Sequence, residues 1–172
     1  MNKDNKDDNL LWVEDDDDNT QDNKYLLFNL GTEIYGVGIK YVINIIELQK
    51  ITEVPDLPSY IKGVINLRGA VIPVMDLRLR FNMTAREYDD RTCIIIVKLD
   101  STQMGFIVDT VAEVHDIFPH DIAPPPSFRK TNGKDRYISG LGKVGESVKI
   151  ILDVEKILYS EDVDSINDKI MA

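Results

Sequence analysis

From Lys24 onward the sequence consists of short apolar runs rich in Val and Ile, separated by turn-forming residues. Turn signals recur about every 8–12 residues, a spacing typical of an all-β protein. Pro55 and Pro58 mark a loop. Residues 40–49 are ambiguous between helix and strand, although their β-branched content favours a strand. The pattern therefore predicts a mostly β fold with only short helical segments.

The strand-like runs divide into two halves that resemble each other in length and content. The polar stretch 83–92 lies between them, and each half contains a proline-rich excursion. Because a β-barrel of roughly 60–70 residues is marginal alone, we expect two barrels that share a hydrophobic core. The expected organisation is a disordered acidic tail over 1–22, a first β-barrel subdomain over 23–83, a second over 84–160, and a C-terminal tail or short helix over 161–172.

Most of the negative charge lies at the N-terminus. Residues 1–22 contain nine acidic residues and two lysines, so they carry −7 of the chain's formal −10. The rest is nearly neutral and has neither the basic stripe of a nucleic-acid binder nor a polybasic membrane patch. The apolar stretch 10–13 is interpreted as part of a solvated tail, with docking as the alternative. The sequence has no apolar run near 18 residues and no secretory signal. Both observations predict a cytoplasmic protein.

Motifs that suggest an enzyme or a metal site lack the context they need. Residues 140–145 match G-x-G-x-x-G, but a strand-like run follows them where a nucleotide site needs a helix. The N-terminal Asp cluster has Thr20 and Leu26 where a calcium loop needs Gly and Glu. His115 and His120 have no metal-ligand spacing, and a single cysteine excludes an internal disulfide. We predict no catalytic residue, no metal and no cofactor.

The stretch GVINLRGAVIPVMDL at 63–77 is typical of a β-hairpin with its turn at Arg68 and Gly69. Pro73 lacks an amide donor, so the second strand is predicted to be an edge strand or to carry a bulge there. Arg68 is expected to project from the hairpin end, on the face opposite the core. It either pairs with a neighbouring carboxylate or contacts a partner, and both interpretations stay open.

The longer stretch YIKGVINLRGAVIPVMDLRLRF closely resembles the signature of the CheW-type chemotaxis coupling proteins. Four further stretches resemble the same family in order: KYLLFNLGTEIYGVGI at 24–39, MGFIVDTVAEV at 104–114, IAPPPSF at 122–128 and YISGLGKV at 137–144. The resemblance implies two SH3-like five-stranded β-barrels around a hydrophobic core, without catalytic activity or cofactor. It also implies a cytoplasmic adaptor, recruited to membrane-associated receptor clusters, that links the tips of methyl-accepting chemoreceptors to the regulatory domain of the histidine kinase CheA. The alternative is a coupling or competitor module for a divergent kinase pathway outside flagellar chemotaxis.

The resemblance assigns two sets of contact residues. The kinase-binding set is Ile39, Val42, Asn44 and Ile45, and the receptor-coupling set is Gly63, Arg68, Cys93 and Val114. A role in the fold is the alternative for Gly63 and Val114, and Cys93 lies in an apolar run that suggests burial. Asn44 stands where the family commonly has a glutamate, so an Arg68–carboxylate pair would lose its charge here unless Glu47 replaces it. We therefore predict that Arg68 is more available to a partner.

Overall fold

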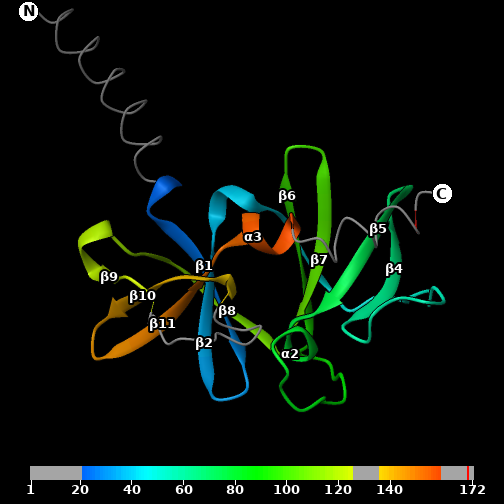
Figure 1. Cartoon of the computed structure of the whole chain (residues 1–172), viewed down its shortest axis with the longest axis horizontal. Helices are drawn as coiled ribbons and strands as arrows, with labels where there is room; N and C mark the ends of the chain where they lie inside the picture. The colour runs from blue at the N-terminus through cyan, green and yellow to red at the C-terminus, as the bar shows by residue number, and fades with distance from the viewer. Residues whose placement is uncertain (1–20, 126–135, 160–169, 171–172) are drawn as a thin grey trace, which may run out of the picture.

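The computed structural model describes residues 21–125, 136–159 and 170, and shows a chain made mostly of β-strands (Figure 1). The expected tails over 1–22 and 161–172 therefore fall almost wholly outside the described residues. Within these described ranges the strands form two sheets, and four short helices have defined bounds. These helices are the 3-10 helices η1 (Ile39–Tyr41) and η2 (Pro119–Asp121) and the α-helices α2 (Leu77–Arg80) and α3 (Val154–Leu158).

The two sheets have six and five strands. The six-stranded sheet has the order β8-β1-β2-β11-β10-β9, and its strands are β1 (Lys24–Leu30), β2 (Glu33–Gly38), β8 (Thr110–Asp116), β9 (Ile122–Ala123), β10 (Ile138–Val144) and β11 (Ser147–Leu152). The five-stranded sheet has the order β3-β6-β7-β5-β4, and its strands are β3 (Val42–Glu47), β4 (Ile61–Leu67), β5 (Ala70–Asp76), β6 (Cys93–Leu99) and β7 (Thr102–Val108). The predicted mostly β architecture with short helices is confirmed.

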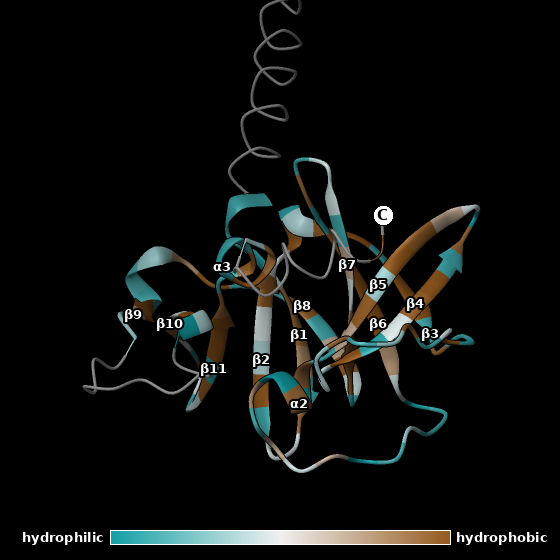
Figure 2. Cartoon of the chain, turned by 45° about the vertical axis from the view of Figure 1, so that its right-hand side comes forward, coloured by the Kyte–Doolittle hydropathy of each residue, from teal (hydrophilic) through white to brown (hydrophobic). Residues whose placement is uncertain are grey.

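The two sheets do not correspond to the two halves of the chain that the sequence predicts, with a boundary between residues 83 and 84. The N-terminal hairpin β1–β2 belongs to the sheet of the C-terminal strands, through antiparallel pairing of β1 with β8 and parallel pairing of β2 with β11. The polar stretch 83–92 connects α2 to β6 (Figure 2), and β5 and β6 lie in the same sheet. The sheet boundary lies at η1 and at Asp109 instead, because strand pairing is decided by contacts distant in sequence.

The prediction for Pro73 is wrong. β5 is not an edge strand, since it lies between β4 and β7, and the register shift in its pairing with β4 falls between Ile61 and Gly63 rather than at Pro73. Its parallel pairing with β7 begins only at Val74, opposite Gly105. The missing amide donor of Pro73 is therefore tolerated because Pro73 precedes the residues that pair with β7.

One large hydrophobic core joins the two sheets. Its buried residues come from β1 and β2 on one side and from β5, β6 and β7 on the other, and α3 adds Val154, Ile157 and Leu158. Alternate residues of β6 face opposite ways: Ile95 and Val97 enter this shared core, whereas Ile94 and Ile96 enter a second cluster inside the five-stranded sheet. Burial on both faces explains why the run TCIIIV is apolar throughout instead of alternating.

Candidate partner-binding surfaces

β3 is one of the two edge strands of the five-stranded sheet, and it carries two exposed isoleucines. Ile43 and Ile45 keep 51% and 42% of their surface accessible. The pairing with β6 shifts register between Val42 and Asn44, so Ile43 lies at a β-bulge. Single exposed apolar residues are common on protein surfaces. Two of them on one edge strand form an apolar surface that a partner protein can cover, so this face suits a protein partner.

The predicted kinase-binding residues lie on or next to this strand but differ in exposure. Ile45 is exposed, and Asn44 is half-buried. Ile39 and Val42 are half-buried and pack against the shared core, so they support the strand from behind. Ile43 is a surface residue that the sequence did not single out. Its exposure follows the regular alternation along β3, in which Ile43, Ile45 and Glu47 are exposed and the residues between them are half-buried.

The β4–β5 hairpin presents Arg68 at its tip. Arg68 and Gly69 have φ values of +53° and +89°, the two positive angles of a type I′ turn. The Asn66 side chain stiffens this turn, since its Oδ1 accepts a hydrogen bond from the amide of Gly69 at 2.9 Å. Arg68 is exposed. The hairpin tip therefore presents its guanidinium group on a backbone of fixed geometry.

Among the residues that the structure describes, Arg68 has no ion pair with Glu47 and no hydrogen bond with the Asn44 side chain. Asn44 instead bonds locally, with Oδ1 accepting a hydrogen bond from the amide of Ile45 at 2.9 Å. β3 and β4 lie at opposite ends of the sheet order, which separates the two positions in the hydrogen-bonded ladder. The Asn44 side chain thus supplies a hydrogen-bond acceptor to a backbone amide of β3.

Gly63 is held against the segment that follows β3. Thr52 and Val64 form an antiparallel bridge, with amide-to-carbonyl distances of 2.8 and 2.9 Å, which joins the segment after β3 to β4. Gly63 has φ +141°, and a Cβ built on it would lie 2.1 Å from the carbonyl oxygen of Thr52. Gly63 is therefore required by the close approach of two backbone segments, whatever further role it has in binding.

The other two receptor-coupling positions lie apart from Arg68. Cys93 begins β6 and is half-buried, and its Sγ lies 3.4 Å from the carbonyl oxygen of Arg91. Val114 is on β8 in the six-stranded sheet and is 48% exposed, so it does not belong to the core. Among the described residues, no hydrogen bond or ion pair joins any two members of the predicted receptor-coupling set.

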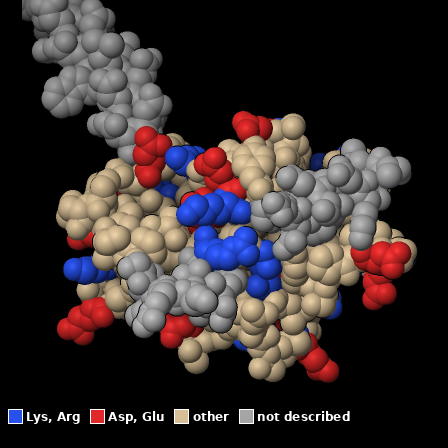
Figure 3. Space-filling view, in the orientation of Figure 1, with Lys and Arg blue, Asp and Glu red and all other residues tan. Residues whose placement is uncertain are grey.

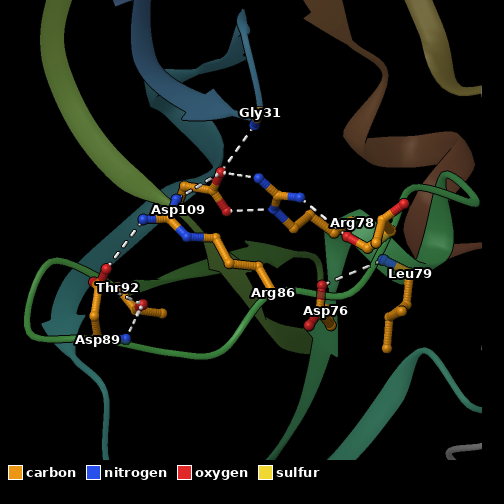
Figure 4. A network of polar contacts seen from close by, with 9 residues as sticks. Gly31, Asp76, Arg78, Leu79, Arg86, Asp89, Thr92 and Asp109 are labelled. Atoms are coloured by element: carbon orange, nitrogen blue, oxygen red, sulfur yellow. Dashed lines mark hydrogen bonds and ion pairs between the residues drawn. The ribbon is translucent and has the colours of Figure 1, made fainter.

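A buried ion pair lies where the chain passes from one sheet to the other (Figure 4). Asp109 separates β7 from β8, and Arg78 of α2 donates to its two carboxylate oxygens at 2.7 and 2.6 Å. The amide of Gly31 donates at 2.8 Å, and Arg86 approaches to 3.2 Å. Burial raises the pKa of Asp109, but the hydrogen bonds from Arg78 and Gly31 outweigh it, so the pKa lies below its usual value. In the sequence, Asp109 lies inside one continuous strand-like run, so the pattern gives no sign of its role.

A second carboxylate, Asp76, caps α2 from the end of β5. Its Oδ1 accepts from the amide of Leu79 at 3.3 Å, and its Oδ2 accepts from the Tyr88 hydroxyl at 2.6 Å. Burial and this hydrogen bond raise the pKa of Tyr88 well above its ordinary value. The connection 83–92 is therefore attached at Tyr88 to the same short helix that supplies Arg78.

Basic side chains gather near the centre of one face of the molecule (Figure 3). Arg80 of α2 lies between two tyrosine rings, with its guanidinium carbon 4.4 Å from the Tyr60 centroid and 4.6 Å from that of Tyr137. Arg136 lies 5.5 Å from the same Tyr137 ring. Stacking of this kind orients guanidinium groups while leaving their charge available, so the nearly neutral body still has a local basic site.

Within the described ranges, no group of three or more His, Cys, Asp or Glu side chains is placed to hold a metal ion. No helix of the described chain is long and apolar enough to cross a membrane. What the structure presents is an edge strand with exposed isoleucines, a hairpin tip with an arginine, and an exposed valine on the second sheet.

Comparison with known proteins decides the family. The CheW-like domain model matches residues 24–162. The chain belongs to the CheW-like family. It is 37% identical over 140 residues to the chemotaxis protein CheW of Klebsiella aerogenes, which covers 81% of this chain and 84% of that protein. It is 34% identical over 145 residues to the CheW protein of Helicobacter pylori, with 84% and 87% covered.

A solved structure agrees with this family. The crystal structure of the scaffolding protein TtCheW from Thermoanaerobacter tengcongensis superposes with a TM-score of 0.74 at 34% identity, covering 81% of this chain and 94% of that one. The SH3-like, two-subdomain fold implied by the sequence is thus confirmed. As a member of a non-catalytic family, the chain is a chemotaxis coupling adaptor.

Proposed function

We propose that the chain joins chemoreceptors to the histidine kinase CheA in the cytoplasm, with the kinase contact at β3 and the receptor contacts at other positions, among them the tip of the β4–β5 hairpin. The observation that carries this proposal is the pair of exposed isoleucines on the edge strand β3, within a domain that matches the CheW-like family over residues 24–162. An edge strand with exposed apolar residues supplies both backbone groups and buried area to a partner.

The kinase surface is centred on Ile43 and Ile45, with Asn44 between them. Contact with the regulatory domain of CheA would cover these side chains, which together are the largest exposed apolar feature of β3. Asn44 tunes this surface, because its side chain is engaged with the amide of Ile45 and carries no charge. The half-buried Ile39 and Val42 act by holding the strand in place.

The receptor contacts are carried by two positions on different sheets, Arg68 after β4 and Val114 on β8. Arg68 stands on a stiff turn, and Val114 is exposed on β8. Gly63 and Cys93 act indirectly, Gly63 through the bridge to Thr52 and Cys93 through its register pairing with Glu47 at the end of β3. Recruitment to membrane-associated receptor clusters follows from this contact.

Co-sedimentation tests the coupling role directly. Membranes that contain a chemoreceptor are mixed with CheA, with or without the chain, and CheA in the pellet is measured. We expect the chain to increase the amount of sedimented CheA, and Ile45→Asp to remove most of that increase. Equal sedimentation of CheA with and without the chain would favour the alternative, a module for a divergent kinase pathway outside flagellar chemotaxis.

A further inference from the structure

β8 is an edge strand of the six-stranded sheet, and in the part of the chain that the structure describes it pairs with β1 and with no second strand. The amide of Ile117 donates to the carbonyl oxygen of Asn23, on the β1 side, at 2.8 Å. Because backbone groups alternate in direction along an antiparallel strand, the amides of Val114 and Asp116 point away from β1. The carbonyl oxygen of Asp116 accepts from Nδ1 of His115 at 3.0 Å, and such an oxygen can accept a second hydrogen bond. The open edge can therefore pair with a strand from another molecule.

Three exposed side chains, each two residues from the next, form a row on one face of this edge: Val114, Asp116 and Phe118. Ile117 points to the opposite face, where it is buried together with Leu27. The backbone of Phe118 is still extended, with φ −81° and ψ 154°, so the alternation of β8 continues as far as this residue. The row is apolar, acidic and apolar in order, and it spans about 13 Å.

The Phe118 ring is held in place by its neighbours in η2. It stacks on the His120 ring, with the two centroids 5.9 Å apart and 3° between the ring planes. The carbonyl oxygen of Phe118 accepts from the amide of Asp121 at 2.8 Å, which fixes the turn after the row. Phe118 still keeps 45% of its surface accessible. An exposed ring of fixed orientation loses little conformational entropy when a partner covers it, so this position is ready for a contact.

The strand and the turn that follows it are acidic. Residues 110–121 contain Glu113, Asp116 and Asp121 and no lysine or arginine. Lys24 of β1 pairs with Oδ1 of Asp116 at 3.1 Å, but the pair lies at the surface and therefore contributes little stability. A cationic side chain of a partner would meet net negative charge beside the two exposed apolar residues of the row, so the charge of this edge favours a basic segment.

We propose that the open edge of β8 binds an extended segment of a partner protein, in which an arginine stands two positions from an apolar residue on either side. When such a segment adds to the sheet as a strand, its alternate side chains lie opposite Val114, Asp116 and Phe118. Arginine fits the central position because a planar guanidinium binds the Asp116 carboxylate and stacks on the Phe118 ring. The inference goes beyond the receptor role proposed for Val114, since it concerns the strand edge, Asp116 and Phe118.

Titration of the full chain with a short peptide, followed by NMR of its backbone amides, tests this proposal. The probe is acetyl-Val-Thr-Arg-Thr-Val-amide, and the matched control peptide has glutamate at the central position. We expect saturable shifts at residues 113–118 with the arginine peptide, and binding of the glutamate peptide weaker by about tenfold or more. Amide exchange at Val114 and Asp116 should slow at saturation, because both amides then donate to the peptide. Equal affinities of the two peptides, or no saturable shift up to about 10 mM of the arginine peptide, would overturn the proposal.

Two variants of the chain locate the contact. Phe118→Ala should weaken binding of the arginine peptide by about fivefold, because the guanidinium loses its stacking surface. Val148→Ala is the matched control, since Val148 is an equally exposed apolar residue on β11 of the same sheet, and it should bind like wild type. Both side chains are exposed, so both variants should keep the thermal stability of wild type. If Phe118→Ala binds as tightly as wild type, or Val148→Ala loses as much affinity as Phe118→Ala, the site is not at this edge and the proposal fails.

Discussion

Arg78 and Asp109 form a bidentate ion pair at the point where the chain leaves the five-stranded sheet for the six-stranded one, with donor–acceptor distances of 2.7 and 2.6 Å. The side chains are 15% and 8% exposed. The same Asp109 oxygen that binds Arg78 Nη2 also accepts from the amide of Gly31 in the β1–β2 turn. One carboxylate therefore connects α2, the sheet junction and the N-terminal hairpin.

Replacing one member of this pair should destabilise the protein strongly. Arg78→Ala leaves the Asp109 carboxylate buried without its main partner, so we expect the free energy of unfolding to fall by about 3–5 kcal/mol. Arg86→Ala is the control, because Arg86 is 47% exposed and also pairs with Asp89. Its loss should cost about 1 kcal/mol or less. Equal decreases in the free energy of unfolding of Arg78→Ala and Arg86→Ala, measured by urea unfolding, would contradict the central position of Arg78.

Stability should depend on the ionisation of Asp109. Its pKa in the folded state is below the ordinary value, whereas the unfolded chain has the ordinary value near 4. Between these two pKa values the unfolded state binds more protons, so stability is complete above about pH 4 and is lost as the pH falls through the folded pKa. Asp109→Asn should be less stable than wild type at pH 7, and its free energy of unfolding should decrease less than that of wild type on acidification. An identical pH profile for the two proteins, measured by urea unfolding, would exclude this contribution.

Gly63 and Gly69 provide a matched pair of glycine substitutions. Gly63→Ala would place a Cβ 2.1 Å from the Thr52 carbonyl oxygen, whereas nothing lies within 4 Å of a Cβ at Gly69, although both residues have positive φ. Gly69→Ala should cost about 1 kcal/mol from backbone strain alone, and Gly63→Ala clearly more. Thermal unfolding of both variants checks this order. If Gly63→Ala is as stable as Gly69→Ala but fails to bind a receptor, its role lies in direct contact.

Arg68 should matter for binding more than for stability. It is exposed at a turn, and no described residue forms an ion pair with it, so Arg68→Ala should leave the unfolding midpoint nearly unchanged. We expect weaker binding to a soluble receptor-tip fragment by about tenfold, the effect of about 1.4 kcal/mol at an interface. Equal affinities of wild type and Arg68→Ala for both the receptor and CheA would show that the arginine serves neither contact.

The sequence predicts the hairpins because their signals are local. The strand-like run that follows the glycines at 140–145 forms β11, which pairs with β10 in a hairpin, and the turn residue Gly145 has φ +61°. Asp153, at the start of the short closing helix, accepts from the amide of Lys156 as an N-cap. β-branched alternation, glycine turns and helix caps each depend on a few neighbouring residues, so a single sequence reveals them.

Pairing between distant strands is not encoded locally, and most differences come from it. The parallel pairs β2–β11 and β5–β7 bring together residues far apart in sequence, so the sheets do not follow the predicted halves. Asp109 interrupts what reads as one continuous strand, because its partners Arg78 and Gly31 become neighbours only after folding. At β3, Ile43 and Ile45 are exposed, whereas Val42 is half-buried against the core, which a resemblance carried over position by position does not reveal.

Calorimetric titration against the regulatory domain of CheA tests the central claim most directly. Wild type, Ile45→Asp and the control Val148→Asp are compared, since both sites are exposed apolar positions on different sheets. A buried charge at an apolar contact is costly, so we predict saturable one-to-one binding by wild type and Val148→Asp, and at least tenfold weaker binding by Ile45→Asp with unchanged thermal stability. Binding by Ile45→Asp as tight as that of wild type would contradict the assignment of the β3 edge as the kinase surface.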